Sequence, residues 1–353
     1  MKKIKIILIV VASILVMGIL QGCSSKKDVS LSEKYKEYFP IGAAVTPENI
    51  VTYDSVLKKN FNSLTAENVM KFSEIHPTED RYSFEKADAI VDYAMENNML
   101  VRGHTLAWYN QVPSWVFKDN KEVASKELVL QRLEDHIKTV VGRYKGKVYC
   151  WDVVNEAIDD GPLTLRRSPW TEITGDEYIK NAFIWTHEAD PEAELFYNDY
   201  NMVLPEKRDK AYEMIKELKE QGIPITGVGI QAHWTLNWPQ ISDIEAAIEK
   251  FASLGIKVQI TELDMSYYSW DDESTKYSEP TEETSALQAQ RYKEIFEVLR
   301  KHKEVISGVT FWGVTDDSSW LNYIPVKGRP NWPLLFDSEM NPKEAYWSIV
   351  DFK

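Results

Sequence analysis

The feature of this sequence that most restricts its fold is a repeated alternation of short apolar runs with amphipathic helical patterns. The apolar runs predict strands at residues 41–45, 61–66, 99–107, 148–155, 195–197, 227–230, 256–262 and 305–311. The helical patterns lie between them, at residues 49–59, 84–97, 125–142, 176–189, 206–221, 241–254 and 284–302, with a last one at 342–350. Strands that alternate with helices form parallel sheets, so eight such units predict an α/β fold with a single (β/α)8 TIM barrel domain. An open doubly wound sheet is the alternative, but it normally carries a glycine-rich phosphate loop, which this sequence lacks.

Two of the predicted strands end abruptly in a glutamate. The run from Val148 to Asn155 is followed by Glu156, and the run from Ile256 to Thr261 is followed by Glu262. In a parallel barrel the carboxyl ends of all strands meet at one mouth, where the catalytic groups of such barrels lie. The sequence therefore predicts that these two carboxyl groups come together.

Further polar and aromatic residues follow the predicted strands at the same ends. They are Glu67, Asn68, Lys71, His104, Trp108, Asn155, Gln231, His233, Asp264, Trp312 and Trp320. Each has a structural explanation when taken alone, since a glutamate at a strand end is usually a surface or capping residue and a lone histidine or tryptophan is usually part of the core. Together they indicate an active site, because a core needs no such collection of amides, carboxylates and rings at one end.

Two carboxylic acids across a barrel mouth suit the cleavage of a glycosidic bond. One must be protonated to donate to the leaving oxygen, and the other must be ionised, so their environments must separate their pKa values. His233 is placed to donate to Glu262, and Asp264 is placed to hold that histidine. Glu156 has an apolar sequence neighbourhood that favours its protonated form, and Asn155 is placed to bind the sugar hydroxyl beside the reacting carbon.

The charge and the metal-binding residue types exclude several other classes of protein. The net charge of -14 argues against nucleic acid as a partner, whereas a neutral polysaccharide is compatible with it. Twelve tryptophans are many for a chain of 353 residues, and flat sugar rings are ligands that such side chains bind. The histidines are scattered and no zinc-binding motif occurs, so we expect no metal and no cofactor. Cys150 is expected to be a buried strand thiol without a disulfide partner.

The N-terminal segment has the pattern of an export signal. Lys2, Lys3 and Lys5 precede an apolar run at residues 6–20, which predicts a signal peptide over residues 1–22. A membrane helix is the alternative, because the run is near the lower length limit for spanning a bilayer. The stretch at residues 20–23 ends in Cys23 and resembles a bacterial lipobox, in which that cysteine becomes the lipid-bearing N-terminus. We therefore expect a lipoprotein on the outer membrane, the cell surface or the periplasmic face, with a polar tether over residues 23–32 and a catalytic domain over residues 33–353.

The motifs at the strand ends resemble those of the family 10 glycoside hydrolases, the barrel endo-β-1,4-xylanases, and occur in the order of that family. They are Thr65-Ala66-Glu67-Asn68-Val69-Met70-Lys71, Arg102-Gly103-His104-Thr105-Leu106-Ala107-Trp108, Trp151-Asp152-Val153-Val154-Asn155-Glu156, Gly229-Ile230-Gln231-Ala232-His233, Ile260-Thr261-Glu262-Leu263-Asp264 and Trp312-Gly313 through Ser319-Trp320. The resemblance implies that Glu156 is the acid/base, that Glu262 is the nucleophile, and that a glycosyl-enzyme intermediate leads to retention. It implies xylan or xylo-oligosaccharides as the substrate, and we expect the enzyme to be a monomer. The glycone-side sugar contacts that it implies are Glu67, Asn68, Lys71, His104, Trp108, Gln111, Asn155, Gln231, His233, Trp312 and Trp320. It also implies that Tyr200 contacts the leaving-group side.

One position departs from the family pattern, and two other functions remain open. The family usually has a histidine after the position of Trp108, whereas this chain has Tyr109, which alters local sugar contacts or the pH optimum. A β-1,4-glucanase is one alternative, although Trp312, Trp320 and Gln111 are candidates for blocking the hydroxymethyl arm of glucose. A non-catalytic, glycan-binding surface lipoprotein is the other, but such a protein has no need of both glutamates.

Overall fold

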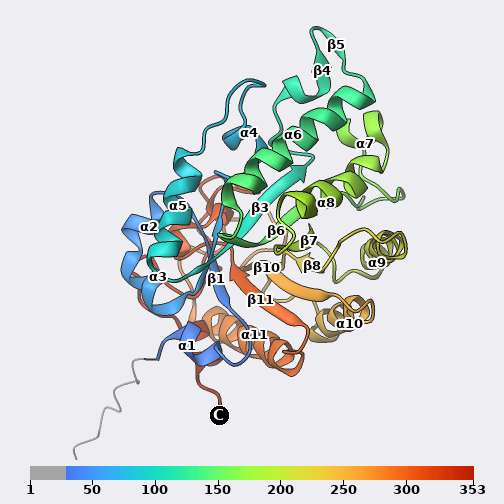
Figure 1. Ribbon diagram of the computed structural model, residues 1–353. Coiled ribbons are helices and arrows are strands. Elements are labelled where there is room, and N and C mark those ends of the chain that lie inside the picture. Colours follow the sequence, from blue (N-terminus) through green and yellow to red (C-terminus); the bar gives the residue numbers. More distant parts are fainter. Residues whose placement is uncertain (1–28) are drawn as a thin grey trace, which may run out of the picture.

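The computed structural model describes residues 29–353, which form a closed barrel of parallel strands surrounded by helices (Figure 1). The barrel strands are β1 (Ile41–Val45), β2 (Ser63–Ala66), β3 (Leu100–Trp108), β6 (Val148–Asn155), β7 (Glu194–Asp199), β8 (Gly227–Ile230), β10 (Lys257–Ser266) and β11 (Ile306–Phe311). They are hydrogen-bonded in the order β11-β1-β2-β3-β6-β7-β8-β10, and β10 pairs with β11 to close the ring. The prediction of a (β/α)8 barrel is therefore confirmed.

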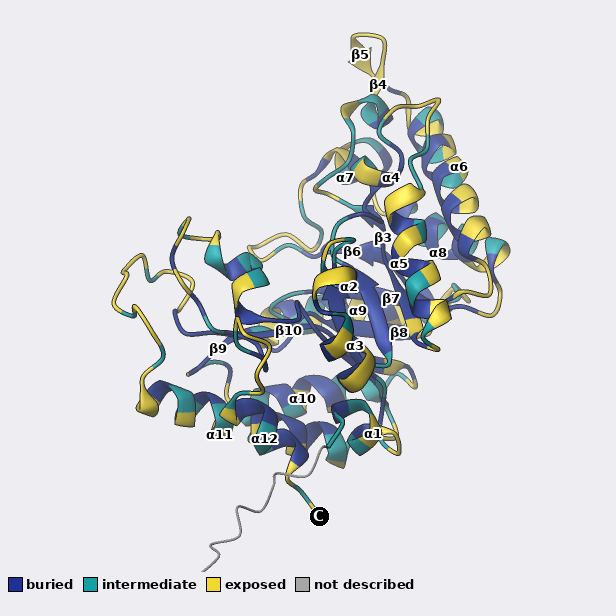
Figure 2. Cartoon of the chain, turned by 90° about the vertical axis from the view of Figure 1, so that its left-hand side faces the viewer, coloured by how far each residue is buried: buried dark blue, intermediate teal, exposed yellow. Residues whose placement is uncertain are grey.

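The helices lie outside the barrel, with their buried faces toward the strands (Figure 2). The longer ones are α3 (Asp54–Asn60), α5 (Glu85–Glu96), α6 (Lys126–Tyr144), α8 (Glu177–Ala189), α9 (Pro205–Glu220), α10 (Ile241–Ala252), α11 (Glu282–Lys301) and α12 (Glu344–Val350). The shorter elements are α1 (Leu31–Tyr35), α2 (Asn49–Thr52), α4 (Phe72–Ile75) and α7 (Pro169–Thr174), with single turns at Ser114–Phe117, Asp316–Ser318 and Trp320–Asn322. A small exposed hairpin of β4 (Lys118–Asp119) and β5 (Glu122–Val123) projects from the body.

The helix ends follow signals that are local in the sequence. Helix α11 begins with a capping box, in which Thr281 and Thr284 each accept a hydrogen bond from the other's backbone N–H. Helix α10 buries Ile244, Ile248 and Phe251, whose spacing of three to four residues places them on one face. These local rules explain why the order of helices and strands can be predicted from the sequence.

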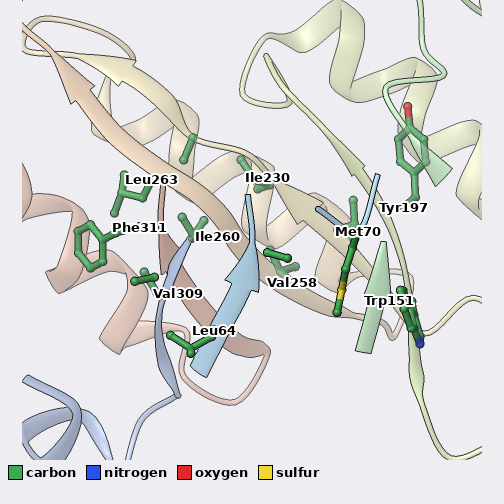
Figure 3. Packing of buried hydrophobic residues seen from close by; sticks show 14 of the residues in the cluster. Leu64, Met70, Trp151, Tyr197, Ile230, Val258, Ile260, Leu263, Val309 and Phe311 are labelled. Atoms are coloured by element: carbon green, nitrogen blue, oxygen red, sulfur yellow. The ribbon is translucent and has the colours of Figure 1, made fainter. Parts of the chain in front are cut away.

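The barrel core combines apolar side chains with buried ionic groups, among them one around Arg102. Leucine, isoleucine, valine and phenylalanine side chains from several strands pack together (Figure 3). Arg102 is fully buried and pairs with Asp152, and its Nε donates to Oε1 of Gln259 at 3.0 Å. Cys150 is a buried free thiol, as expected, with its Sγ 3.9 Å from the same Gln259 oxygen.

Several boundaries differ from the predicted ones, three of them as follows. The helix predicted for residues 49–59 is divided at Tyr53 into α2 and α3. The second strand begins at Ser63 rather than at residue 61. The seventh strand does not end at Glu262 but continues to Ser266, because its last residues pair with the additional strand β9 (His233–Thr235). This pairing is possible because Ala232 adopts a left-handed backbone with φ of 66° and turns the chain after β8.

The folded domain also begins earlier than residue 33, the predicted boundary. Leu31 opens α1 and is fully buried, and Ser30 caps this helix by accepting a hydrogen bond from the N–H of Glu33 at 3.3 Å. The Tyr346 hydroxyl donates to the carbonyl of Val29 at 2.6 Å. Because this segment is mostly polar, the sequence did not indicate that the side chain of Leu31 is buried against the barrel. The predicted signal peptide over residues 1–22 and the lipidation site at Cys23 lie outside the described residues.

We expect Gly103→Ala to destabilise the barrel strongly. A Cβ at Gly103 would lie 2.1 Å from the ring of Trp151, which is fully buried on the neighbouring strand and has no room to move. Overpacking of this kind costs about 3 kcal/mol of unfolding free energy. Gly142→Ala in α6 is the matched control, because nothing lies within 4 Å of its added methyl group. That substitution should stabilise the protein by roughly 0.5–1 kcal/mol. Thermal unfolding of the two variants should move in opposite directions, and equal shifts would contradict the packing argument.

Candidate active site

A cleft of about 660 Å³ lies at the carboxyl ends of the barrel strands. Its lining contains every residue predicted from the sequence to be catalytic or to contact sugar, from Glu67, Asn68, Lys71, His104, Trp108 and Gln111 through Asn155, Glu156, Tyr200, Gln231, His233 and Glu262 to Trp312 and Trp320. Asp264 lies behind His233 and is bonded to it. The closed barrel is what brings together residues that are up to about 250 positions apart in the chain.

Glu156 is held in an unusual backbone conformation at the end of β6. Its φ of 57° lies in the left-handed region, which a glutamate rarely adopts and which costs of order 1–3 kcal/mol. Two hydrogen bonds fix this conformation. The N–H of Glu156 donates to the carbonyl of Asn198 at 2.9 Å, and Nε of Arg166 donates to the carbonyl of Glu156 at 3.0 Å. The strained residue is thus held from two sides, and its side chain lines the cleft.

The Glu156 carboxyl group lies in surroundings that favour its protonated form. Burial raises its pKa, the hydrogen bond from Gln231 lowers it, and the nearby charge of Glu262 raises it, with a net upward shift. The bond from Nε2 of Gln231 to Oε1 of Glu156 is 2.8 Å long. Only 7% of the residue is exposed. The expectation of a raised pKa at this position therefore agrees with the geometry.

Glu262, in β10, lies in surroundings that favour its ionised form. Burial alone would raise its pKa, but the hydrogen bond and the charge of His233, with further help from His104 and Asn198, lower it below the usual range. His233 Nε2 lies 3.2 Å from Glu262 Oε2, and His233 Nδ1 lies 3.0 Å from Asp264 Oδ2. Asp264 outweighs the effect of burial on His233, so the pKa of this histidine is raised and the ring is held as a cation.

Asn198 connects the two glutamates, and the sequence analysis did not identify it. Its Nδ2 donates to Glu262 Oε1 at 2.8 Å and to Asn155 Oδ1 at 2.8 Å. Asn155 in turn lies beside Glu156, with its Nδ2 3.3 Å from Glu156 Oε1. One continuous network of amides therefore joins the carboxyl groups. The signal that could have found Asn198 is its place among the polar residues at the end of the fifth strand.

Polar side chains around Lys71 form one wall of the cleft. Nζ of Lys71 donates to Oδ1 of Asn68 at 2.9 Å and lies 5.0 Å from the centre of the Trp108 ring. Burial lowers the pKa of Lys71, while the carboxylates of Glu262 and Glu67 raise it, with a net downward shift. Lys71 thus offers a buried cation beside these acids, where sugar hydroxyl groups can bind.

Aromatic rings form a second wall of the cleft. The rings of His233 and Trp320 are 5.0 Å apart, and Nε1 of Trp320 donates to Asp264 Oδ2 at 2.8 Å. Trp312 lies 5.3 Å from the ring of His104, whose Nδ1 lies 2.8 Å from Asp152 Oδ2. These walls combine flat apolar faces with fixed polar groups, which suits a sugar ring.

Trp270 extends this wall and was missed in the sequence analysis. It lies on the polar loop after β10, lines the cleft, is 44% exposed and packs 5.7 Å from the Trp320 ring. The surrounding charged residues gave no sign that this tryptophan faces the cleft.

Among the described residues, one group of side chains lies close enough together to hold a metal ion. Glu245 and Glu249 of α10 and His302 after α11 bring ligand atoms within 4.8 Å of one another, in the outer layer of helices. Lys301 is also paired with Glu245, at 2.5 Å. None of these residues lines the cleft.

Comparison with known proteins agrees with this geometry. Residues 30–352 match the model of "Glycosyl hydrolase family 10". A "Beta-1,4-xylanase" of Dictyoglomus thermophilum is 56% identical over 92% of this chain and 91% of its own. An "Endo-1,4-beta-xylanase" of Geobacillus stearothermophilus is 51% identical over 91% of this chain and 98% of its own. A solved structure described as a mutant in complex with xylotriose superposes with a TM-score of 0.90 at 51% identity, covering 92% of this chain and 100% of that one. The chain belongs to glycosyl hydrolase family 10.

Proposed function

We propose that this protein hydrolyses internal β-1,4-xylosidic linkages of xylan with retention of configuration. The observation that carries the proposal is the pair Glu156 and Glu262. They line one cleft, they are joined through Asn155 and Asn198, and their pKa values are shifted in opposite directions. Opposite shifts assign an acid role to Glu156 and a nucleophile role to Glu262.

In the first step, an oxygen of Glu262 attacks the anomeric carbon of the bound sugar. The bond from that carbon to the leaving oxygen breaks, and Glu156 transfers its proton to this oxygen. The product is a glycosyl ester on Glu262 and a free sugar chain with a new hydroxyl group. His233 and Asn198, which hydrogen-bond the ionised Glu262 at 3.2 Å and 2.8 Å, keep the carboxylate aligned for attack.

In the second step, water attacks the same carbon and the ester bond breaks, while Glu156 accepts the proton of the water. The esterified Glu262 no longer carries a charge, so the repulsion that raised the pKa of Glu156 is removed. The same residue therefore acts as an acid in the first step and as a base in the second.

Xylan is the substrate that the cleft and the relatives favour over glucan. The named relatives are xylanases, and Trp312, Trp320 and Gln111 lie together in the cleft lining, where they would meet the hydroxymethyl arm of a glucose unit. We also propose that the enzyme acts as a monomer, because a single barrel holds both glutamates and the amide network that joins them.

The test is to incubate the purified protein with xylan, carboxymethyl-cellulose and mannan and to separate the products by mass. Xylo-oligosaccharides released only from xylan would support the proposal. Products mainly from cellulose would favour a glucanase, and binding to xylan without any product would favour a glycan-binding protein.

We expect Asp264→Asn to move the acidic limb of the pH profile upward. Asp264 keeps His233 protonated, and the charge of His233 lowers the pKa of Glu262. Without this charge, Glu262 becomes protonated at a higher pH, and the nucleophile is lost sooner as the pH falls. The acidic limb of kcat/KM should move up by about one unit, whereas the alkaline limb, which reports the acid Glu156, should move less. An acidic limb at its wild-type position would contradict the role of Asp264.

We further propose that the protein is exported and held at a membrane by a lipid on Cys23, with residues 1–22 removed. The support is the basic segment, the apolar run and the lipobox pattern of the sequence. Helix α1 lies beside the C-terminus (Figure 1), and it also contacts Asn60 near the start of β2, at the end of the barrel opposite the cleft. A tether leaving from residue 29 would therefore direct the cleft away from the membrane. Within residues 29–353, no helix has both the length and the apolar character needed to cross a bilayer.

Cys23→Ala should move the protein from the membrane fraction to the soluble fraction after export. The reason is that the thiol of Cys23 is the proposed attachment point of the lipid. Cys150→Ala is the control, because this thiol is buried in the barrel and should not affect fractionation. Membrane association that survives Cys23→Ala would show that the apolar segment itself is the anchor.

A further inference from the structure

Arg166 lies in the loop that follows Glu156, at the point where this loop has folded back toward the end of β6. The loop leaves β6 after Glu156, Ile158 pairs with Leu165 across it, and the N–H of Arg166 donates to the carbonyl of Ala157 at 2.8 Å. The guanidinium group then reaches the carbonyl of Glu156 at 3.0 Å. Arg166 is thus one of the two residues that hold the left-handed backbone of Glu156.

The same guanidinium group holds two aromatic rings that line the cleft beside Glu156. It lies 4.6 Å from the centre of the Tyr109 ring, and it donates to the Tyr200 hydroxyl at 2.6 Å. Tyr109 follows β3 and Tyr200 follows β7, so the rings come from the two strands on either side of β6. The two rings therefore belong to the side of the cleft where Glu156 meets the leaving group.

A partly buried ionic network fixes the position of Arg166. Nη2 of Arg166 lies 3.0 Å from Asp160 Oδ2, and Nζ of Lys207 lies 2.9 Å from the other oxygen of Asp160 and 2.8 Å from Asp199 Oδ1. Lys207 is only 3% exposed, and its Nζ lies 3.5 Å from the centre of the Tyr200 ring. Two carboxylates and two cations thus balance one another and leave the guanidinium little freedom.

We propose that Arg166 is a positioning residue that aligns the leaving-group side of the substrate with the acid/base Glu156. It ties the backbone of Glu156 to the rings of Tyr109 and Tyr200, so that a sugar resting on those rings presents its glycosidic oxygen to the carboxyl group. This inference rests on the proposed acid role of Glu156. Arginine suits the task because its planar guanidinium group makes directed hydrogen bonds in a fixed fork while it stacks on a ring, a combined geometry that the point charge of lysine does not offer.

The experiment compares Arg166→Gln, Arg166→Lys and the control Arg167→Gln on two substrates. Arg167 is the adjacent residue, is largely exposed and has only a long contact of 3.7 Å with Glu172. One substrate is xylotetraose, which places sugar on the leaving-group side and needs a proton. The other is 2,4-dinitrophenyl β-xylobioside, whose leaving group needs neither a sugar contact nor a proton.

We expect Arg166→Gln to lower kcat/KM about 10²-fold on xylotetraose and only a few-fold on the dinitrophenyl substrate. Arg166→Lys should lose most of the same activity on xylotetraose, and Arg167→Gln should match the wild type on both substrates. Equal losses on the two substrates, or no loss on either, would overturn the proposal. Tyr200→Phe removes the hydroxyl that accepts the 2.6 Å bond from Arg166 and donates to Asp160, and it gives a second readout if Arg166→Gln fails to fold. A loss restricted to xylotetraose is expected for Tyr200→Phe as well.

The pH profile separates positioning from a purely structural role. The charged and titratable groups that act on Glu156 are Glu262, Lys71, Tyr109, Asp199 and Arg166. Among these, the charge of Arg166 lowers the pKa of Glu156. Arg166→Gln should therefore move the alkaline limb of kcat/KM to higher pH, whereas Arg166→Lys should leave it nearly in place. An unmoved limb in Arg166→Gln would overturn the link to Glu156. Glu156→Ala, measured on the same two substrates, tests the acid role itself, so that failure of that role and failure of the Arg166 proposal are told apart.

Discussion

Glu262→Ala should abolish xylan cleavage while leaving the fold intact. The carboxylate forms the bond to the anomeric carbon, and no other described carboxylate occupies its place between His233 and Asn198. Loss of a nucleophile that forms a covalent intermediate lowers kcat by roughly 10⁴- to 10⁶-fold. Release of reducing ends from xylan measures the effect, and circular dichroism measures the fold. Activity within tenfold of the wild type would refute the assignment of the nucleophile.

Glu67→Ala is the control for Glu262→Ala, because Glu67 is another carboxylic acid of the same cleft. Glu67 also lines the cleft and is half-buried, and burial raises its pKa, so it is a second glutamate of the same cleft in a different environment. We expect Glu67→Ala to weaken substrate binding but to leave measurable turnover. If Glu67→Ala were as inactive as Glu262→Ala, the roles of these two residues would have to be exchanged or shared.

Glu156→Ala should slow the first chemical step most for substrates whose leaving group must be protonated. On xylan, kcat/KM should fall by about 10²- to 10⁴-fold, the range for a general acid. On 2,4-dinitrophenyl β-xylobioside the fall should be small, because dinitrophenolate leaves without a proton. Equal losses in kcat/KM on both substrates would count against the acid role.

The second step of the same variant gives an independent signature. Without Glu156 no group takes the proton from the attacking water, so the glycosyl-enzyme should accumulate and a burst of dinitrophenolate should precede a slow steady state. Azide needs no base and should restore the steady-state rate by forming a xylobiosyl azide. Failure of azide to accelerate the reaction would indicate that the variant is impaired for a reason other than the missing base.

The sequence allowed the barrel and the two glutamates to be predicted, because the signals for both are local. Strand and helix periodicities repeat every two and 3.6 residues, and a glutamate at the end of an apolar run needs only its neighbours to be noticed. Once eight parallel strands close into a barrel, their carboxyl ends must meet, so the residues at those ends of β2, β3, β6 and β10 had to share one mouth. The pairing of His233 with Glu262 and Asp264 followed from the same reasoning.

Other features were decided only by the tertiary structure, because their partners are remote in the chain. Asn198 bridges Asn155 and Glu262 across three strands, and Trp270 reaches the cleft from a loop whose composition is that of a surface. The left-handed backbone of Glu156 depends on a carbonyl at residue 198 and on the guanidinium of Arg166. Local sequence determines which elements form and which groups stand at their ends. The conformation and charge state of those groups depend on hydrogen bonds and burial that exist only after the barrel has closed.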